Sequence, residues 1–397
     1  MSSTVPPHTA TLPPDIEQAP EFQHPHPEHE LQETEAQLEE EKTAKYYLKI
    51  DDQFLIITQL LFWAVLGNLA RIGLTLLTNY EYAYINYILG TCLWSNFASC
   101  LIIATVNKMD KFWEVVLNTS PNGNDKKKSA LYLGLTTGFC GSFSTFSSFV
   151  LEVMLKTCDL ILPHYYNDEQ WFDHRGDGAK DFFSVLFIQV GVSMFGWCIG
   201  CDLAKLIDWL VGKYGALSYG SWRIFVQITS FLGIGALIAN LVLSITLDEY
   251  HWYKNKFSIA ICFSPFGVIL RYYLSKLNGW KCWFPTGTFL ANLTSCAVLC
   301  PMVILIYGVK GTDSDSDNIV NSQKRIMVMH AIITGFCGTL STMSTVINEL
   351  MGQTAPRRWI YFLTTFIICF CLLLVIIGSY SLAKYFYMES ENSYFNY

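Results

Sequence analysis

The same short pattern occurs twice in this chain, and each copy lies inside an apolar stretch long enough to cross a lipid bilayer. The first copy reads GFCGSFSTFSSF (residues 138–149) and the second reads GFCGTLSTMSTV (residues 335–346). Two further pairs recur in the same order, because GNLARIGL matches GVILRYYL and GTCLWSNFASC matches GTFLANLTSC. The offsets at the shared Arg, Asn and first Gly are 200, 196 and 197 residues. A repeat at nearly constant spacing predicts one structural unit present twice.

Composition places this repeat in a membrane. The chain is 52% hydrophobic and 15% charged, whereas a soluble domain carries about 25% charged residues. Apolar stretches of about 20 residues cross the hydrocarbon core as helices. We expect an all-α polytopic membrane protein with nine spans, near residues 53–77, 83–106, 129–157, 182–210, 223–246, 256–276, 283–308, 326–352 and 359–385.

The odd number of spans decides how the two copies are oriented. Four spans per copy would leave both copies facing the same way, and the extra span at 223–246 reverses the second. The sequence therefore predicts two inverted four-helix repeats joined by a single linker transmembrane helix, with the functional site near the midplane where the repeats meet. The expected domains are an acidic tail (1–49), a first four-helix unit (50–215), the linker (216–250), a second, inverted unit (251–386) and a short C-terminal tail (387–397).

Charge outside the spans predicts the topology. Residues 1–49 contain ten acidic and three basic residues, and their low hydrophobicity predicts a disordered tail. Lys and Arg are more frequent in the segments that share a side with the N-terminus, which predicts a cytoplasmic N-terminus and an extracellular C-terminus.

Polar residues recur at the same depth in both copies. Asn96 and Asn292 lie in the middle of their spans. An unpaired amide in hydrocarbon costs roughly 2–7 kcal/mol, so each must face protein, water or a ligand. The two alternatives are a pore-lining role and a hydrogen bond between helices. The glycines of each GFCG stretch predict a break in the third helix of each repeat, or alternatively a close helix crossing.

The residues after the first break have the chemistry of an anion site. Hydroxyl groups recur at 144, 145, 147 and 148, and Phe146 and Phe149 lie one turn apart. Aromatic edges carry partial positive charge, so hydroxyls, amides and ring edges together favour a small anion. We expect Arg71 near the outer end of the first helix and Arg271 near the inner end of the sixth, where they either draw anions to the mouths or anchor the helices at the interface.

Other classes of protein have less support. No nucleophile–base pair, metal-ligand set or phosphate-binding loop is visible, so we expect neither an enzyme nor a nucleic-acid-binding protein. A secondary transporter of small organic solutes with an inverted-repeat fold is the first alternative, and it would require a titratable group in the core. A membrane scaffold that binds partners through its acidic tail is the second, and it gives no reason for polar residues to recur at membrane depth.

With these motifs in place, residues 50–385 resemble the fluoride exporter family, which comprises the bacterial Fluc channels and their fused eukaryotic relatives. The resemblance is carried by the G-x-x-x-R stretches at 67–71 and 267–271, the Gly-Thr stretches before the two asparagines, and the GFCG-x-x-S-T-x-S stretches. It implies a single chain of two fused antiparallel units that functions as a monomer.

The resemblance also implies roles for individual residues. Asn96, Asn292, Phe146 and Phe149 would line fluoride pores, with the hydroxyls of Thr145, Ser148, Thr342 and Thr345 beside them. Main-chain carbonyls near Gly141, Ser144, Gly338 and Ser341 match a structural sodium site, which would be the only cofactor. The second copy departs from the pattern at Met343 and Val346, where the family has phenylalanines, so the two pores cannot be equivalent.

The resemblance finally implies a passive mechanism. Fluoride enters acidified cells as neutral HF and is trapped as the anion, so a channel that releases it protects the cell. A membrane potential drives the anion out with about 2.3 kcal/mol per 100 mV. Export is useful only across the plasma membrane, where we expect the protein to lie.

Overall fold

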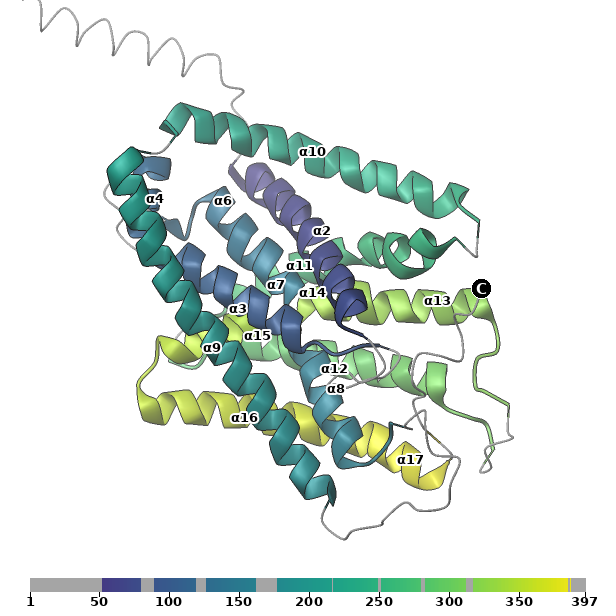
Figure 1. Ribbon diagram of the computed structural model, residues 1–397. Helices are drawn as coiled ribbons and strands as arrows, with labels where there is room; N and C mark the ends of the chain where they lie inside the picture. Colours follow the sequence, from purple (N-terminus) through teal and green to yellow (C-terminus); the bar gives the residue numbers. More distant parts are fainter. Residues whose placement is uncertain are drawn as a thin grey trace, which may run out of the picture. The chain divides into compact units, whose positions relative to one another are not determined.

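The computed structural model describes residues 52–79, 89–118, 126–161, 177–215, 217–248, 251–279, 283–311, 317–384 and 386. Within these ranges the regular elements are all helical (Figure 1). They are α2 (Asp52–Thr78), α3 (Leu93–Lys108), α4 (Asp110–Leu117), α6 (Ala130–Leu133), η1 (Gly134–Cys140), α7 (Gly141–Phe143), α8 (Phe146–Thr157), α9 (Asp177–Tyr214), α10 (Tyr219–Thr246), η2 (Lys254–Ser258), α11 (Ile259–Ser275), α12 (Thr286–Tyr307), α13 (Gln323–Ala331), η3 (Ile332–Cys337), α14 (Gly338–Leu340), α15 (Met343–Met351), α16 (Ala355–Leu373), η4 (Leu374–Gly378) and α17 (Ser379–Ala383). The predicted tails, 1–49 and 387–397, lie outside the described residues.

Eight helical runs are long and apolar enough to cross a membrane. They agree within a few residues with eight of the nine predicted spans. The remaining prediction, 83–106, corresponds to α3, which has 16 residues. At 1.5 Å per residue such a helix is about 24 Å long, shorter than a hydrocarbon core of about 30 Å, and residues 80–88 before it lie outside the described part. The ninth span is therefore not confirmed.

Burial separates central helices from peripheral ones. The most apolar window of Ala130–Thr157 is 89% buried, whereas the corresponding windows of α9 and α10 are 22% buried. Large apolar side chains such as Phe187, Phe195 and Ile228 are exposed on those two helices. This distribution fits α9 and α10 facing lipid, with the helix that carries the first motif in the interior.

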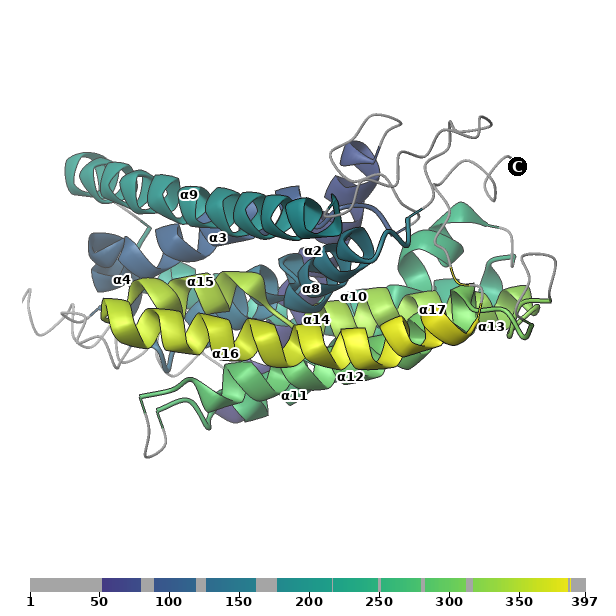
Figure 2. The ribbon, with the colours of Figure 1, turned by 90° about the horizontal axis from the view of Figure 1, so that it is seen from below.

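Glycines set how closely the helices pack. α9 runs along α3 (Figure 2), and an added Cβ at Gly196 or Gly200 would lie 2.6 or 2.1 Å from a carbonyl oxygen of α3. The same holds at the repeated motif, where a Cβ at Gly138 would lie 2.9 Å from the Cβ of Trp63 and one at Gly335 would lie 2.2 Å from the carbonyl oxygen of Ala260. These glycines therefore permit close crossings with α2 and α11.

The helix that carries each GFCG stretch is broken, as predicted. The backbone becomes extended at Ser144 (φ −94°, ψ 160°) and at Ser341 (φ −78°, ψ 154°). Helix resumes after Thr145 and Thr342, whose hydroxyls accept hydrogen bonds from the backbone N–H groups three residues later. The predicted cause needs correction, because the second glycine of each motif has helical dihedrals. The S-T-x-S sequence, acting as an N-cap, makes the break.

Candidate functional site

The two helix breaks meet in a buried cluster of hydroxyl groups. The Ser144 Oγ lies 3.2 Å from the Thr342 Oγ1, and the Thr145 Oγ1 lies 3.0 Å from the Ser341 Oγ. The Ser144 Oγ also lies 2.9 Å from the Ser344 Oγ. Each contact joins a residue of one motif to a residue of the other, so the repeated sequences form one shared polar centre. Such a centre is stable in an apolar core only because its members satisfy one another.

The paired asparagines hold the two breaks, but they are not equally satisfied. The Oδ1 of Asn96 accepts the Thr145 N–H at 2.8 Å, and the Oδ1 of Asn292 accepts the Thr342 N–H at 2.8 Å. The Nδ2 of Asn96 donates to the Thr145 carbonyl and to the Cys92 Sγ. In the described part of the chain the Nδ2 of Asn292 has no partner. Both side chains are fully buried, so Asn292 carries an unused donor.

The aromatic pair lies on α8, which packs against α12, the helix that carries Asn292. The rings of Phe146 and Phe149 pack edge to face with centroids 5.5 Å apart, and Phe149 contacts Phe366 of α16 at 5.6 Å. Helix α8 packs against α12, where the hydroxyl of Ser295 lies 3.0 Å from that of Ser147. One side of the centre is therefore built from Asn292, the two phenylalanines and α16.

The other side lacks aromatic rings from the motif. Helix α15 carries Met343 and Val346, both fully buried, and it packs against α3 and α9. The hydroxyls of Ser148 and Thr345 lie beside the caps of their own helices, at 3.2 and 3.1 Å from the Thr145 and Thr342 oxygens.

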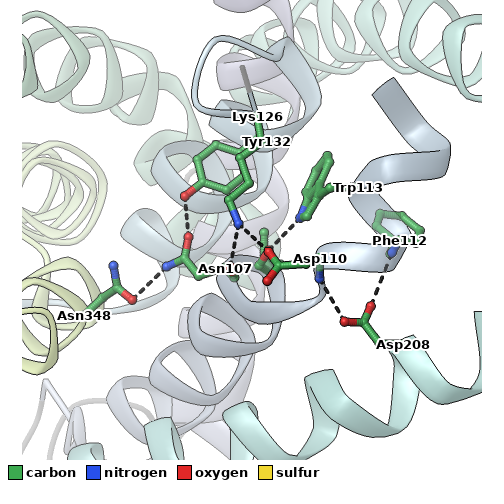
Figure 3. Close-up of polar contacts among 9 residues, drawn as sticks. Asn107, Asp110, Phe112, Trp113, Lys126, Tyr132, Asp208 and Asn348 are labelled. Atoms are coloured by element: carbon green, nitrogen blue, oxygen red, sulfur yellow. Dashed lines mark hydrogen bonds and ion pairs between the residues drawn. The ribbon is translucent and has the colours of Figure 1, made fainter. Parts of the chain in front are cut away.

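An amide pair joins α3 to α15 on the Asn96 side. Figure 3 shows Asn107 of α3 donating to the Asn348 Oδ1 at 2.7 Å, while the hydroxyl of Tyr132 donates to Asn107. Lys126 adds an ion pair with Asp110 at 2.9 Å. At the offsets of the repeat, Asn107 and Asn348 correspond to Val303 and Leu151, which are buried and apolar. The two sides therefore differ at their ends as well as at the motif.

Two carboxylates lie next to this centre, and their contacts with the Gly-Thr stretches were not predicted. Glu152 accepts from the hydroxyl of Thr91 at 3.1 Å and from the backbone N–H of Cys92 at 2.6 Å. The side chain of Gln189 donates to the same carboxylate. Each carboxylate follows its motif by the same number of residues in both copies, and each contacts the Thr of its Gly-Thr pair. That shared spacing was the available signal.

In the second copy, Glu349 accepts from the hydroxyl of Thr288 at 2.7 Å, from Asn278 at 3.0 Å and from the hydroxyl of Tyr361 at 2.7 Å. One turn after Tyr361 on α16, the hydroxyl of Thr365 is buried and has no partner among the described residues. A line of polar groups thus leads from Glu349 through α16 toward the side that holds Asn292.

We expect Tyr361→Phe to destabilise the protein. The Oε2 of Glu349 would lose its hydroxyl donor, and an unsatisfied, largely buried oxygen costs about 1 to 3 kcal/mol. The thermal unfolding midpoint in detergent should fall. Tyr219, which is 44% exposed, provides the matched control, and an equal change for Tyr219→Phe would contradict the assigned bond.

The placement of the two arginines differs from the prediction. Arg71 and Arg271 were expected near the mouths, but they are only 6% and 4% exposed. Their guanidinium groups lie against the backbone of the broken helices, where they donate to carbonyl oxygens. The reason is physical: helix ends at membrane depth leave carbonyls unpaired, and a guanidinium with five donors satisfies several at once.

The predicted sodium site does not fit these residues. Of its four carbonyl groups, that of Gly141 already accepts a hydrogen bond of 2.5 Å from the Nη1 of Arg271. A sodium ion there would share its ligand with a fixed cation. Among the described residues no group of three or more acidic, His or Cys side chains is placed to hold a metal ion.

These features define a class: a polytopic α-helical membrane protein whose two copies of one motif form a buried, hydrogen-bonding centre. Comparison with known families matches residues 58–164 and 258–379 to one family, described as CrcB-like protein, Camphor Resistance (CrcB). The chain belongs to this family and carries its domain twice.

Curated relatives agree with this assignment. Fluoride export protein 1 of Candida albicans is 31% identical over 347 residues, which cover 86% of this chain and 82% of the relative. Fluoride export protein 1 of Saccharomyces cerevisiae is 28% identical over 358 residues, which cover 80% of this chain and 91% of the relative. Fluoride-specific ion channel FluC of Methanococcus aeolicus is 32% identical over 114 residues, or 28% of this chain and 82% of the relative. No solved structure matches significantly.

Proposed function

We propose that this protein is a passive, fluoride-selective channel that exports fluoride from the cytoplasm and thereby protects the cell from fluoride. The family, present twice in the chain, and the names of its relatives support this function. A secondary transporter of organic solutes is not favoured. The family consists of channels and exporters, which is not an enzyme class.

The proposal extends to the architecture that the function requires. The two family segments form inverted repeats within nine spans, α3 being the short one, and residues 216–250 act as the linker. One chain of two fused units is then sufficient for transport as a monomer. The protein resides in the plasma membrane with its N-terminus in the cytoplasm, as the loop charges favour.

The proposed conduction pathway is the one on the side of Asn292. The observation that supports it is the unused, buried Nδ2 donor of Asn292 on α12, the helix that packs against α8 with its Phe146 and Phe149. Its Oδ1 is fixed by the Thr342 N–H, so the amide cannot rotate without losing that bond, and its N–H groups stay directed at the pathway. An anion that sheds water there gains an amide donor and ring edges.

The chemistry of this lining explains how a passive pathway can be selective without trapping the ion. Amide and hydroxyl donors replace part of the hydration shell of a small anion, while no ammonium group is needed to bind it directly. The hydroxyl of Thr365, which has no partner among the described residues, continues the polar line. In this pathway, fluoride passes from one hydrogen-bond donor to the next.

The test is fluoride efflux from proteoliposomes driven by a potassium diffusion potential, with chloride as the control anion. We expect a fluoride flux that depends on the potential and no measurable chloride flux. Equal chloride flux, or no fluoride flux from a chain that is folded and reconstituted, would refute the proposal.

A further inference from the structure

The two broken helices end in buried residues, so their last carbonyl groups lie inside the protein. α7 ends at Phe143 and α14 ends at Leu340, and a helix leaves its last four carbonyls without an internal partner. Each is preceded by a π-helical turn, η1 or η3, in which the backbone hydrogen bonds are shifted by one residue. The C-terminal ends also carry partial negative charge from the helix dipole, so both breaks attract cations.

Arg271 supplies a cation to the first break. Its Nη1 donates to the Gly141 carbonyl at 2.5 Å, and its Nη2 donates to the Thr137 carbonyl of η1. The fit depends on glycine, because a Cβ at Gly141 would lie 2.4 Å from the Cζ of Arg271. Arg271 belongs to the second copy and both acceptors belong to the first, so the contact joins the two halves.

Arg71 makes the reciprocal contact. Its Nη2 donates to the carbonyl of Thr334 in η3, the residue that matches Thr137 in the repeat. A Cβ at Gly338 would lie 1.9 Å from the Nη1 of Arg71. Arg71 also donates through Nε to the Ser142 carbonyl at 3.1 Å, and so bridges both broken helices. Each copy thus provides an arginine that donates to the broken helix of the other copy.

Among the residues that the structure describes, no carboxylate pairs with either arginine. The ion pairs formed within the described residues join Lys126 to Asp110, Lys180 to Asp177 and Lys205 to Asp202. The guanidinium groups instead donate to backbone carbonyls and, at 2.5 Å from Arg71, to the Asn68 Oδ1, while the Nε of Arg271 has no partner among the described residues. Their charges therefore interact with the two helix ends and not with an acidic side chain.

We propose that Arg71 and Arg271 are the built-in cations of the two helix breaks, each provided by one copy to the other, and that they replace a bound metal ion at this centre. A guanidinium at the Gly141 carbonyl removes one ligand from a four-carbonyl sodium site and repels a second cation placed beside it. The second glycine of each GFCG motif then provides the space for the arginine of the other copy: Gly141 for Arg271 and Gly338 for Arg71. This explains why that glycine recurs in both copies.

The first experiment uses the unaltered full-length protein, purified in detergent and dialysed into N-methyl-D-glucamine chloride. Its thermal unfolding midpoint is compared with that in sodium chloride at equal ionic strength. We expect the same midpoint in both salts and no stoichiometric sodium by atomic emission. A midpoint that rises with sodium in a saturable manner would overturn the proposal. Because this readout does not involve transport, its failure is separate from a failure of the proposed function.

The second experiment is a double-mutant cycle between Gly141→Ala and Arg271→Ala. Alone, Gly141→Ala should lower the unfolding midpoint strongly, because the new methyl group meets the guanidinium. In the Arg271→Ala background the same substitution should have a much smaller effect, since the space is free. Arg325→Ala, which removes an exposed arginine, should leave the effect of Gly141→Ala unchanged. Additive effects of Gly141→Ala and Arg271→Ala would overturn the contact. If Gly141→Ala does not fold, the comparison of salts still decides the proposal.

Discussion

Asn292→Ala should reduce fluoride efflux by about tenfold to a hundredfold, because a hydrogen bond to a charged group contributes about 1.5 to 3 kcal/mol. Its effect on stability should be modest, since the Asn292 side chain makes one hydrogen bond, to the Thr342 N–H. Asn96→Ala should instead affect stability more than it affects fluoride efflux. The Asn96 side chain makes three hydrogen bonds, so its loss should lower the unfolding midpoint further while leaving flux per folded chain closer to that of the unaltered protein.

The measurement is efflux per reconstituted, folded chain, with the unfolding midpoint determined on the same preparations. Size-exclusion chromatography before reconstitution excludes misfolded material. Equal losses of flux in the two variants would contradict the assignment of the pathway, as would a larger loss for Asn96→Ala.

The second large effect is expected from the aromatic pair. Replacing both Phe146 and Phe149 by leucine keeps the side chains apolar and of similar size but removes the ring edges. Each edge interaction is worth about 1 kcal/mol, so efflux should fall by about tenfold or more. The matched substitution, Met343→Leu with Val346→Leu, changes the corresponding positions of the other copy and should leave efflux nearly unchanged.

Chloride flux is the second readout for this pair of variants. If the rings contribute to anion selectivity, the leucine variant should lose fluoride flux without gaining chloride flux, because no donor has been added. Similar losses from the two double variants would mean that the pathways are equivalent, contrary to the difference between FSSF and MSTV in the sequence.

The sequence predicted the helical class, eight of the spans and both helix breaks, because each depends on local composition. Apolar length determines a span, and the breaks were predicted at the right place from the glycines, although the adjacent S-T-x-S sequence is what makes them. The repeat also predicted that Asn96 and Asn292 occupy equivalent positions. In the structure each accepts the backbone N–H of the threonine that follows the break, Thr145 or Thr342. These are properties that a short stretch of chain carries by itself.

The sequence could not locate Arg71 and Arg271, because their positions depend on which carbonyls the other copy presents. A hydropathy pattern places an arginine within a span but does not identify its partner 134 or 263 residues away. The same limit applies to Glu152, whose partners Thr91 and Gln189 come from different helices. The sequence places Asn96 and Asn292 at equivalent positions of the repeat. Only the structure shows that the Nδ2 of Asn96 has partners and that of Asn292 has none among the described residues.

The reciprocal contacts of Arg71 and Arg271 have a consequence for biosynthesis. When the ribosome has inserted only the first half, the carbonyls of Thr137 and Gly141 are already in the membrane, but their donor, Arg271, has not yet been made. The first broken helix therefore cannot reach its final packing until translation has passed residue 271. A chain cut between the copies would leave these carbonyls without the donor that Arg271 provides.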